Sequence, residues 1–490
     1  MYELYTADEM KRNERYTIAE VGIPSIVLME KAAEAVFAEV QRCNPEGREI
    51  CVVVGSGNNG ADGIAAARML HLHGEKVVVY AIGNENNATE EYKLQRSIYE
   101  KIGGCITDKY DFNETGTVVD AMLGIGLSRE LGGRYAEVCN ALNDRQDIVK
   151  VAIDIPTGIN ADDGCCMGTA LRCDITVCIG DMKAGAFLKD GPEYTGRVIC
   201  RDINIIRNEQ GSIKVLEDTD VSGLVGRRHP VSNKGTYGKL LIIAGSDNMP
   251  GASVLCSRAA FKSGAGMVRL VTSSLAGDRV IKAMPEVMIS NYDRDNITDY
   301  FRWCDCILIG PGLGGSKSVE ELLIKVLRES GKTVIVDADA LAVLGDNMDI
   351  LNERRDCATI VTPHPKEFSR LFKTDTLSKM HQNVSFVKKM AAEYGIIIVA
   401  KDHTSLITDG NNIYANINGT DALATAGTGD VLAGLIGCLA MNGDDILKAC
   451  AAAAYIHGKA GCKAAEKASN YAVTASDVID GIVDVMKSYE

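Results

Sequence analysis

The sequence lacks any long hydrophobic run. Nowhere in its 490 residues do about 18 apolar residues follow one another, so no membrane-spanning helix is expected. The opening segment, MYELYTADEMKRNE, has no apolar stretch of the kind found in a signal peptide and is typical of the start of a helix. These absences predict a soluble, cytoplasmic protein.

An excess of basic residues is also missing. Lysine and arginine together number 52 against 66 aspartates and glutamates, which gives a formal net charge of -14. Proteins that bind nucleic acids or anionic membranes depend on positive charge, so neither is expected as a partner. Any anionic small molecule must then be held locally, by backbone amides and a few lysine or arginine side chains.

Two further patterns are missing. The 16 cysteines are scattered, and the closest pairs, Cys165-Cys166 and Cys304-x-Cys306, do not have the spacing of a zinc site. We expect most of them to be small buried residues in a reducing compartment. No short repeat period is visible, which excludes a solenoid.

The chain does contain two series of alternating strand and helix patterns. The first series has strand candidates at residues 50–54, 77–82, 117–121, 149–153 and 175–179, and the second at 240–244, 268–272, 306–309, 333–336, 359–361 and 396–400. Apolar strands separated by helices predict parallel sheets covered on both faces. We therefore predict two three-layer α/β domains, residues 1–216 and 217–490, because a polar stretch lies between the series.

The most informative segment is ATAGTGDVLAG, residues 424–434. Gly427 and Gly429 permit a tight turn, and the apolar run 431–441 predicts a buried helix that begins there. Unpaired N–H groups and the helix dipole favour negative charge at such a start. With Asp430 in the turn as a general base, the pattern suggests a hydroxyl meeting a phosphoryl group. The alternative is an ordinary glycine-rich helix start capped by Asp430.

In the first half, GSGNNGADG (55–63) has the G-x-G-x-x-G spacing of dinucleotide-binding loops. The next strand ends without the acidic residue that would hold a ribose. Two later strand ends carry Asp120 and Asp154, and the carboxyl ends of parallel strands meet at one edge of a sheet. Asn59, Asp120 and Thr157 supply oxygen donors for a hard cation at that edge. Alternatively, Asp120 and Asp154 merely cap the loops that follow.

Together, GSGNNGADG, VDAMLGIG and DIPTGIN resemble the Rossmann-like NAD(P)H-hydrate epimerase domain. The resemblance implies that Asn59, Asp120 and Thr157 bind potassium and that Asp154 contacts the reacting nicotinamide ring. It further implies a substrate-binding set made of Asn58, Asn59, Gly60, Ala61, Asp62, Gly124, Ile125, Gly126, Leu127, Ser128, Arg129, Glu130 and Asp154. This sequence has Ala61, Thr157 and Asn160 where the epimerase family usually has Gly, Ser and Asp. The changes at Ala61 and Thr157 remove no ligand-binding donor group.

In the second half, KGTYGKLLIIAGS, SGAGMVRLVT, IGPGLG, VIVDADAL, VTPHPKEFSRL and the GTGD turn resemble the ribokinase-like NAD(P)H-hydrate dehydratase. The resemblance implies Asp430 as the catalytic base. It places Ala252, Gly314 and His364 in the hydrate pocket with Asp430, and Lys401, Asp402, His403, Thr404, Ser405 and Gly429 at the nucleotide. Lys366 and Asp402 replace usual glycines, and Asp402 brings a negative charge to the nucleotide loop.

The two resemblances imply a bifunctional repair enzyme for NADHX and NADPHX, the hydrates of the reduced nicotinamide cofactors. One domain would interconvert the R and S epimers with K⁺ bound, and the other would dehydrate the S epimer using ADP or ATP with Mg²⁺. A homo-oligomer is expected. Two alternatives stay open: a vitamin or sugar kinase with a non-catalytic nucleotide-binding N-terminal domain, and an N-terminal half that serves only as a scaffold.

Overall fold

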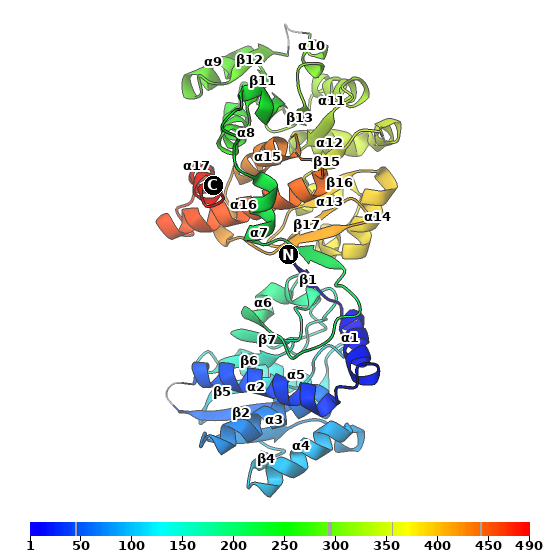
Figure 1. Cartoon of the computed structure of the whole chain (residues 1–490), viewed down its shortest axis with the longest axis vertical. Helices are drawn as coiled ribbons and strands as arrows, with labels where there is room; N and C mark the ends of the chain where they lie inside the picture. The colour runs from blue at the N-terminus through cyan, green and yellow to red at the C-terminus, as the bar shows by residue number, and fades with distance from the viewer. Residues whose placement is uncertain (45–46, 293–295, 355, 442) are drawn as a thin grey trace. The chain divides into compact units, whose positions relative to one another are not determined.

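The computed structural model describes residues 1–44, 47–292, 296–354, 356–441 and 443–490. The chain divides into two compact units, which are treated separately below. One unit is Glu3–Ile213, and the other combines Met1–Tyr2 with Lys214–Glu490. Each contains a mainly parallel sheet with helices on its faces (Figure 1).

The N-terminal unit has a seven-stranded sheet of order β4-β3-β2-β5-β6-β7-β8, and every described pairing in it is parallel. Its strands are β2 (Glu49–Val54), β3 (Val77–Ala81), β4 (Cys105–Thr107), β5 (Thr115–Ala121), β6 (Val149–Ile153), β7 (Ile175–Ile179) and β8 (Arg197–Arg201). Its helices are α1 (Ala7–Ala19), α2 (Ser25–Cys43), α3 (Asn58–Leu72), α4 (Glu90–Lys101), α5 (Gly133–Asn143) and α6 (Gly191–Thr195).

Side chains of alternate residues of β2 pack on opposite faces of this sheet. Val52 and Val54 belong to a core that also contains Ala33 of α2 and Ile64 of α3. Cys51 and Val53 belong to a second core on the α5 side. Successive side chains of a strand point to opposite faces, so an uninterrupted apolar run is what a doubly covered strand requires.

The five predicted N-terminal strands are confirmed, with small changes at their ends. Helix α3 begins within the GSGNNGADG motif, at Asn58. The segment Asn58, Asn59, Gly60, Ala61 and Asp62, interpreted as a ligand-binding loop, is therefore the first turn of α3.

The C-terminal unit is built on an eleven-stranded sheet of order β1-β9-β18-β17-β16-β15-β14-β13-β10-β11-β12. Its strands are β1 (Tyr2–Leu4), β9 (Ile213–Val215), β10 (Lys239–Ile243), β11 (Met267–Thr272), β12 (Met288–Asn291), β13 (Cys306–Ile309), β14 (Thr333–Val336), β15 (Thr359–Val361), β16 (Ile397–Ala400), β17 (Ser405–Thr408) and β18 (Ile413–Asn416). The six predicted strands are present and parallel. β16 pairs in parallel with β15, but β17 runs antiparallel to both β16 and β18, which the parallel-sheet prediction missed.

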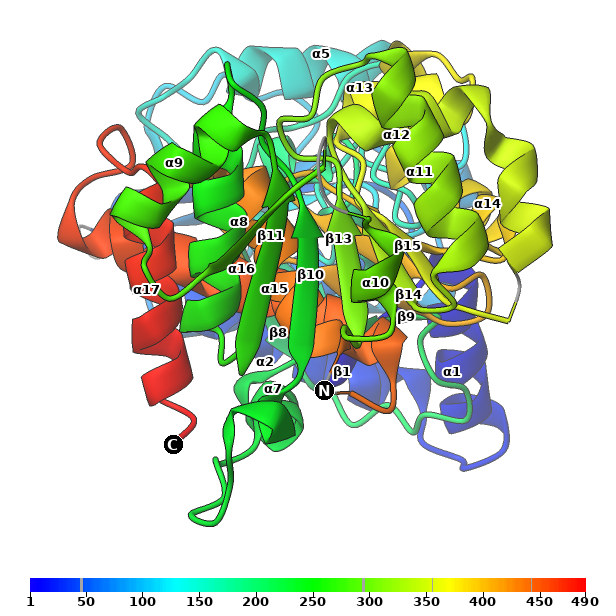
Figure 2. The same cartoon turned by 90° about the horizontal axis from the view of Figure 1, so that it is seen from above.

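Helices α8, α15, α16 and α17 pack against one another on one side of this sheet, and α11 to α14 lie on the other side (Figure 2). The helices of the unit are α7 (Asp218–Val225), α8 (Pro250–Lys262), α9 (Ser274–Ala283), α10 (Thr298–Phe301), α11 (Lys317–Glu329), α12 (Asp339–Asp346), α13 (Pro365–Leu371), α14 (Val384–Tyr394), α15 (Thr428–Ala440), α16 (Ile446–Lys467) and α17 (Ala475–Lys487). The predicted helix after the GTGD turn is α15, and almost every residue of it is buried.

None of the helices in the described part of the chain is long and apolar enough to cross a membrane.

Candidate active sites

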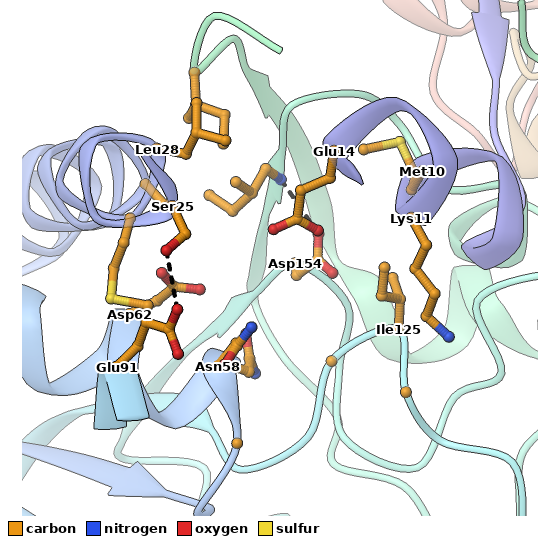
Figure 3. A pocket seen from close by; sticks show the side chains of 18 of the residues that line it. Met10, Lys11, Glu14, Ser25, Leu28, Asn58, Asp62, Glu91, Ile125 and Asp154 are labelled. Atoms are coloured by element: carbon orange, nitrogen blue, oxygen red, sulfur yellow. Dashed lines mark hydrogen bonds between the residues drawn. The ribbon is translucent and has the colours of Figure 1, made fainter. Parts of the chain in front are cut away.

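The N-terminal unit contains a pocket of about 460 Å³ at the carboxyl ends of β2, β5, β6 and β7 (Figure 3). Seven predicted substrate residues line it: Asn58, Asn59, Asp62, Gly124, Ile125, Gly126 and Asp154. Ligands of open α/β sheets bind at this edge because the loops after the strands converge there. The sequence prediction of the pocket's position thus agrees with the structure.

Six other predicted substrate residues do not line this pocket. Gly60 and Ala61 are buried in the first turn of α3, while Leu127, Ser128, Arg129 and Glu130 lie in the loop beyond Gly126. A Cβ on Gly60 would lie 2.0 Å from the carbonyl oxygen of Gly55, so glycine is needed there for close packing. Asn160 accepts hydrogen bonds from the amides of Asp162 and Asp163 and shapes a turn.

Asp154 is held in an unusual backbone conformation at the pocket floor. Its φ is +74°, which is rare for a residue with a side chain and is seen most often at functional sites. Its carboxylate forms an ion pair with Lys183, whose side chain is 1% exposed. Burial opposes the charge of this ammonium, but Asp154 more than offsets that effect and raises the pKa of Lys183. The structure therefore places a buried ion pair where the resemblance expects contact with the ring.

Two further carboxyl groups face the same pocket, Asp62 from α3 and Glu14 from α1 (Figure 3). Burial, together with the negative charge of Asp154, raises the pKa of both groups, and the pKa of Asp62 is raised well above its ordinary value. Lys183 opposes these shifts without cancelling them. The pocket thus combines one carboxyl group paired with a lysine and two carboxyl groups whose pKa values are raised.

The predicted cation ligands Asp120 and Thr157 lie together behind the pocket. Asp120 is fully buried and accepts hydrogen bonds from the Thr157 amide (2.8 Å), the Thr157 hydroxyl (2.7 Å) and the Met122 amide (3.1 Å). Burial raises its pKa to about 6, although these hydrogen bonds act in the opposite direction. Asn59 adjoins Gly124, and its buried Nδ2 has no hydrogen-bond partner among the described residues. Asp120 and Thr157 thus bring two of the three predicted cation ligands into direct contact.

Helix α1 and the segment from Ile203 to Arg207 form one wall of the pocket, which no motif predicted. Met10, Lys11 and Glu14 of α1 line the pocket together with Ile203 and Ile205. The fully buried Asn13 joins the two parts, because its Oδ1 accepts the amide hydrogen bonds of Asn208 and Glu209.

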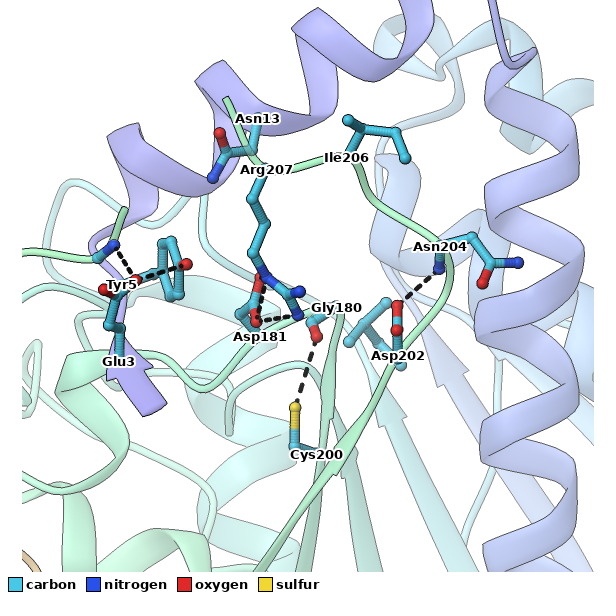
Figure 4. Close-up of polar contacts among 12 residues, drawn as sticks. Glu3, Tyr5, Asn13, Gly180, Asp181, Cys200, Asp202, Asn204, Ile206 and Arg207 are labelled. Atoms are coloured by element: carbon cyan, nitrogen blue, oxygen red, sulfur yellow. Dashed lines mark hydrogen bonds and ion pairs between the residues drawn. The ribbon is translucent and has the colours of Figure 1, made fainter. Parts of the chain in front are cut away.

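Arg207 extends this wall to the turn that carries Lys183. Its guanidinium makes two parallel hydrogen bonds with Asp181, two residues before Lys183 (Figure 4). Cys200 donates to the carbonyl oxygen of Gly180 in the same turn. Paired Arg–carboxylate hydrogen bonds fix direction as well as distance, so the segment after β8 positions the turn that presents Lys183.

In the C-terminal unit, the GTGD segment forms the predicted turn at the start of α15. Gly427 adopts φ +92°, and Asp430 lies in the first turn of the helix. The buried His457 on α16 lies 3.0 Å from the Thr428 carbonyl oxygen through its Nε2. Burial lowers the pKa of His457 to about 4, so its ring is neutral at pH 7 and Nε2 donates this hydrogen bond. No sequence motif pointed to His457, because it lies in an alanine-rich helix.

Asp430 shares its surroundings with an acid and a lysine. Lys401 Nζ lies 3.0 Å from the buried Asp337 carboxylate, which also accepts the Thr362 hydroxyl hydrogen bond at 2.6 Å. A Cβ on Gly429 would lie 3.5 Å from Lys401 Nζ, so the ammonium sits directly against the GTGD turn. Burial and the charge of Asp337 raise the pKa of Asp430 to about 7, while Lys401 acts in the opposite direction. A half-buried carboxyl with this pKa is suited to take a proton at neutral pH.

Ala252, Gly314 and His364, the other predicted hydrate-pocket residues, each contact their own surroundings in this unit. Ala252 packs against Gly312, since a Cβ added to Gly312 would lie 3.0 Å from the Ala252 methyl group. The backbone amide of Gly314 donates a hydrogen bond to the Asp339 carboxylate, at 2.8 Å. His364 is half-exposed and caps α13, because its Nδ1 accepts the amide hydrogen bonds of Lys366 and Glu367. The flanking prolines thus hold the ring in a capping position.

The predicted nucleotide segment 401–405 is only partly accessible. Thr404 and Ser405 are buried, and the Thr404 carbonyl accepts a hydrogen bond from Gln382. The unusual Asp402 carboxylate lies 2.6 Å from His381 Nε2 and accepts the amide hydrogen bond of His403. Although burial opposes its charge, these contacts lower the pKa of Asp402. Its charge is therefore held by local partners.

Comparison with known proteins identifies both units. Residues 25–185 match the family model of the YjeF-related protein N-terminus, and residues 240–483 match that of NAD(P)H-hydrate dehydratase. A bifunctional NAD(P)H-hydrate repair enzyme of Moorella thermoacetica is 31% identical over 99% of this chain and 97% of its own length. The chain belongs to the family of bifunctional NAD(P)H-hydrate repair enzymes.

Solved structures similar to this repair-enzyme family member include two with comparable coverage. An ADP/ATP-dependent NAD(P)H-hydrate dehydratase of Bacillus subtilis, co-crystallised with ATP and Mg²⁺, is 29% identical with a TM-score of 0.50 and covers 57% of this chain and 99% of its own. A ribokinase-like superfamily protein of Enterococcus faecalis is 25% identical with a TM-score of 0.51 and covers 57% and 96%. The predicted family and α/β fold class are confirmed.

The repair-enzyme motifs did not include every residue that shapes the two sites. Lys183 lies in the loop after β7, and Asp154 directly follows β6. Because ligands bind at the carboxyl ends of parallel strands, its position in the sequence could have identified Lys183 as a candidate site residue. Asp337 likewise ends β14 within the quoted VIVDADAL motif. Glu14 and Arg207 lie outside the matched range 25–185, and only the folded chain connects them to the pocket.

Proposed function

We propose that residues 1–216 epimerise R- and S-NAD(P)HX and that residues 217–490 dehydrate S-NAD(P)HX to NAD(P)H at the expense of ADP or ATP. The observation that carries the proposal is the carboxyl of Asp430, with a pKa of about 7, at the amide-rich start of α15. The Asp154–Lys183 pair in the N-terminal pocket supports the second activity.

Dehydration follows from the arrangement around α15. Hydroxide is a poor leaving group and phosphate a good one. Asp430 takes the proton of the ring hydroxyl as that oxygen attacks the terminal phosphoryl group of the nucleotide. Amides of the 427–429 turn and the Lys401 ammonium stabilise the charge that develops on this group. The bond between this phosphoryl group and the rest of the nucleotide breaks, and AMP (from ADP) or ADP (from ATP) leaves. The lone pair of the ring nitrogen then expels phosphate as a C=N bond forms, and loss of a proton from the adjacent ring carbon regenerates the dihydronicotinamide.

Asp337 is a positioning residue in this scheme. It fixes Lys401 by an ion pair and keeps the Asp430 carboxyl from ionising at low pH. Among the described residues, no group of three His, Cys, Asp or Glu side chains is placed to hold a metal ion. Mg²⁺ would therefore enter with the nucleotide phosphates, whose charge it would neutralise.

A pH profile tests the pairing of Asp337 with Asp430. Because the base acts when deprotonated, kcat/KM for dehydration should rise with pH through about 7, the pKa of Asp430. Asp337→Asn removes a negative neighbour and frees Lys401 to face Asp430, and both changes lower that pKa. We expect the acidic limb to move down by about 1 pH unit or more. An unchanged limb in Asp337→Asn would contradict the assigned coupling.

For epimerisation we propose K⁺ bound by Asn59, Asp120 and Thr157, which would anchor the Asp120 carboxylate and the 123–124 segment of the pocket. Thr157→Val removes the hydroxyl that contacts both Asp120 and the Leu123 amide. We expect the K⁺ concentration for half-maximal epimerase rate to rise about 10- to 100-fold. The measurement is a K⁺ titration at constant ionic strength. A wild-type rate independent of K⁺ would sink the cation assignment.

The function itself is tested with purified protein and a mixture of R- and S-NADHX. Recovery of the NADH absorbance is followed with saturating ADP and separately with ATP. Recovery of nearly all the hydrate, faster than spontaneous epimerisation, is expected. Recovery of the S fraction alone would leave the N-terminal half without its activity and favour the scaffold alternative. A stable phosphorylated alcohol, with no recovery, would favour the kinase alternative. The homo-oligomeric state and the cytoplasmic location stay predictions.

A further inference from the structure

The N-terminal pocket has more carboxyl groups than the cations around it neutralise. Asp62, Glu14, Glu91 and Asp154 all line it, and the buried cation among the lining residues, Lys183, pairs with Asp154. Glu91 accepts a hydrogen bond from Ser25, at 2.9 Å. These contacts distinguish the four acids, because two of them have partners that the structure identifies.

Asp62 differs from the others in its surroundings. Its carboxyl points into the pocket from α3, and no described residue forms a hydrogen bond or ion pair with it (Figure 3). The carboxyl groups of Asp154 and Glu14 are close enough to act on it electrostatically, and both oppose its ionisation. Burial, acting first, and these two neighbouring carboxyl groups raise the pKa of Asp62 and favour its protonated form.

The elements around Asp62 contribute the following charged groups to the pocket. Helix α1 contributes Glu14 and the exposed Lys11, and α4 contributes Glu91. Helix α2 presents Ser25, Leu28 and Met29 to the pocket, and its Glu30 is paired with Arg68. Lys183, beyond β7, is held by Asp154 and by the Ile179 carbonyl oxygen.

We propose that Asp62 is the general acid of the epimerase site and that Asp154, held by Lys183, is its general base. This inference rests on the proposed epimerase function and assigns the two proton-transfer roles within it. Two carboxyl groups in different environments, here one paired with a lysine and one without a cation partner, are the usual basis for such a division of roles.

The assigned step balances as follows. The bond between the hydrated ring carbon and its hydroxyl oxygen breaks, and the electron pair leaves with the oxygen. That oxygen takes the proton of Asp62 and departs as water, while the ring nitrogen's lone pair forms a C=N bond. Water then adds to the other face of the carbon, its proton passes to Asp154, and the C=N electron pair returns to nitrogen. Proton transfer from Asp154 back to Asp62 through pocket water completes the cycle, with no oxidant or reductant.

The test uses the full-length chain, whose dehydratase activity is an internal control. Asp62→Asn keeps the size of the side chain but cannot supply the proton. We expect epimerase kcat to fall about 10²- to 10⁴-fold while dehydration of purified S-NADHX is unchanged. The exposed Asp8→Asn on α1 is the matched control for loss of one carboxylate and should leave both rates unchanged.

The pH profile separates an acid from a merely structural residue. Wild-type epimerase activity should fall at high pH as Asp62 loses its proton, and the residual activity of Asp62→Asn should lack this basic limb. Glu14→Gln removes a like charge from Asp62, so the basic limb should move to lower pH. An Asp62→Asn variant with wild-type rate, or with the basic limb intact, would overturn the role of Asp62 alone. A wild-type chain without epimerase activity would overturn the proposed function as well.

Discussion

Replacement of Asp430 by asparagine is expected to slow dehydration of S-NADHX about 10²- to 10⁴-fold, the usual cost of removing a general base. The asparagine side chain preserves the size of the group but cannot accept the proton of the ring hydroxyl. Dehydration is measured as NADH absorbance at saturating ADP or ATP with purified S epimer. Epimerase activity of the same preparation should not change, because Asp430 lies in the other unit.

A matched control variant distinguishes loss of the general base from loss of one negative charge. Asp346→Asn removes one exposed carboxylate at the end of α12 and should leave the dehydration rate unchanged. Nucleotide affinity should also be little affected in Asp430→Asn, because the amides of the turn remain. Dehydration by Asp430→Asn at the wild-type rate would show that another group takes the proton.

Replacement of Lys183 by methionine is expected to have two large effects on the N-terminal unit. It leaves the Asp154 carboxylate without its partner, which costs about 3–5 kcal/mol of unfolding free energy when a buried pair is broken. It also removes the ammonium group that pairs with the proposed general base, so epimerisation should fall at least about 100-fold. Urea unfolding followed by circular dichroism and an epimerase assay measure the two effects.

The double variant Asp154→Asn/Lys183→Met separates these effects. With both charges gone, no unpaired ion is buried, and most of the lost stability should return. Epimerase activity should stay low, because neither charged group is restored. The single tryptophan, Trp303, lies in the C-terminal unit, so its fluorescence should report the same unfolding midpoint in every variant. Recovered activity in the double variant would contradict the catalytic role of the pair.

Much of the fold could be predicted because its strands are short apolar runs with polar or glycine residues after them. Strands such as β6 and β13 were located to the residue. The antiparallel pairing of β17 with β16 could not be read this way, since its alternation resembles that of any short strand. The start of α3 was missed because the glycines of GSGNNGADG favour a loop in isolation, while in the folded chain they allow close packing against Gly55.

The sequence by itself determined the family, the two α/β units, the strand ends that carry Asp120 and Asp154, and the turn that carries Asp430. These are local properties, because a turn motif and the carboxylate within it occupy consecutive positions. Only the tertiary structure decided which charged side chains lie next to one another. Lys183 reaches Asp154, Asp337 controls Lys401 next to Asp430, and Glu14 of α1 opposes ionisation of Asp62. Protonation of a buried acid depends on desolvation and on neighbours distant in sequence, and folding alone sets both.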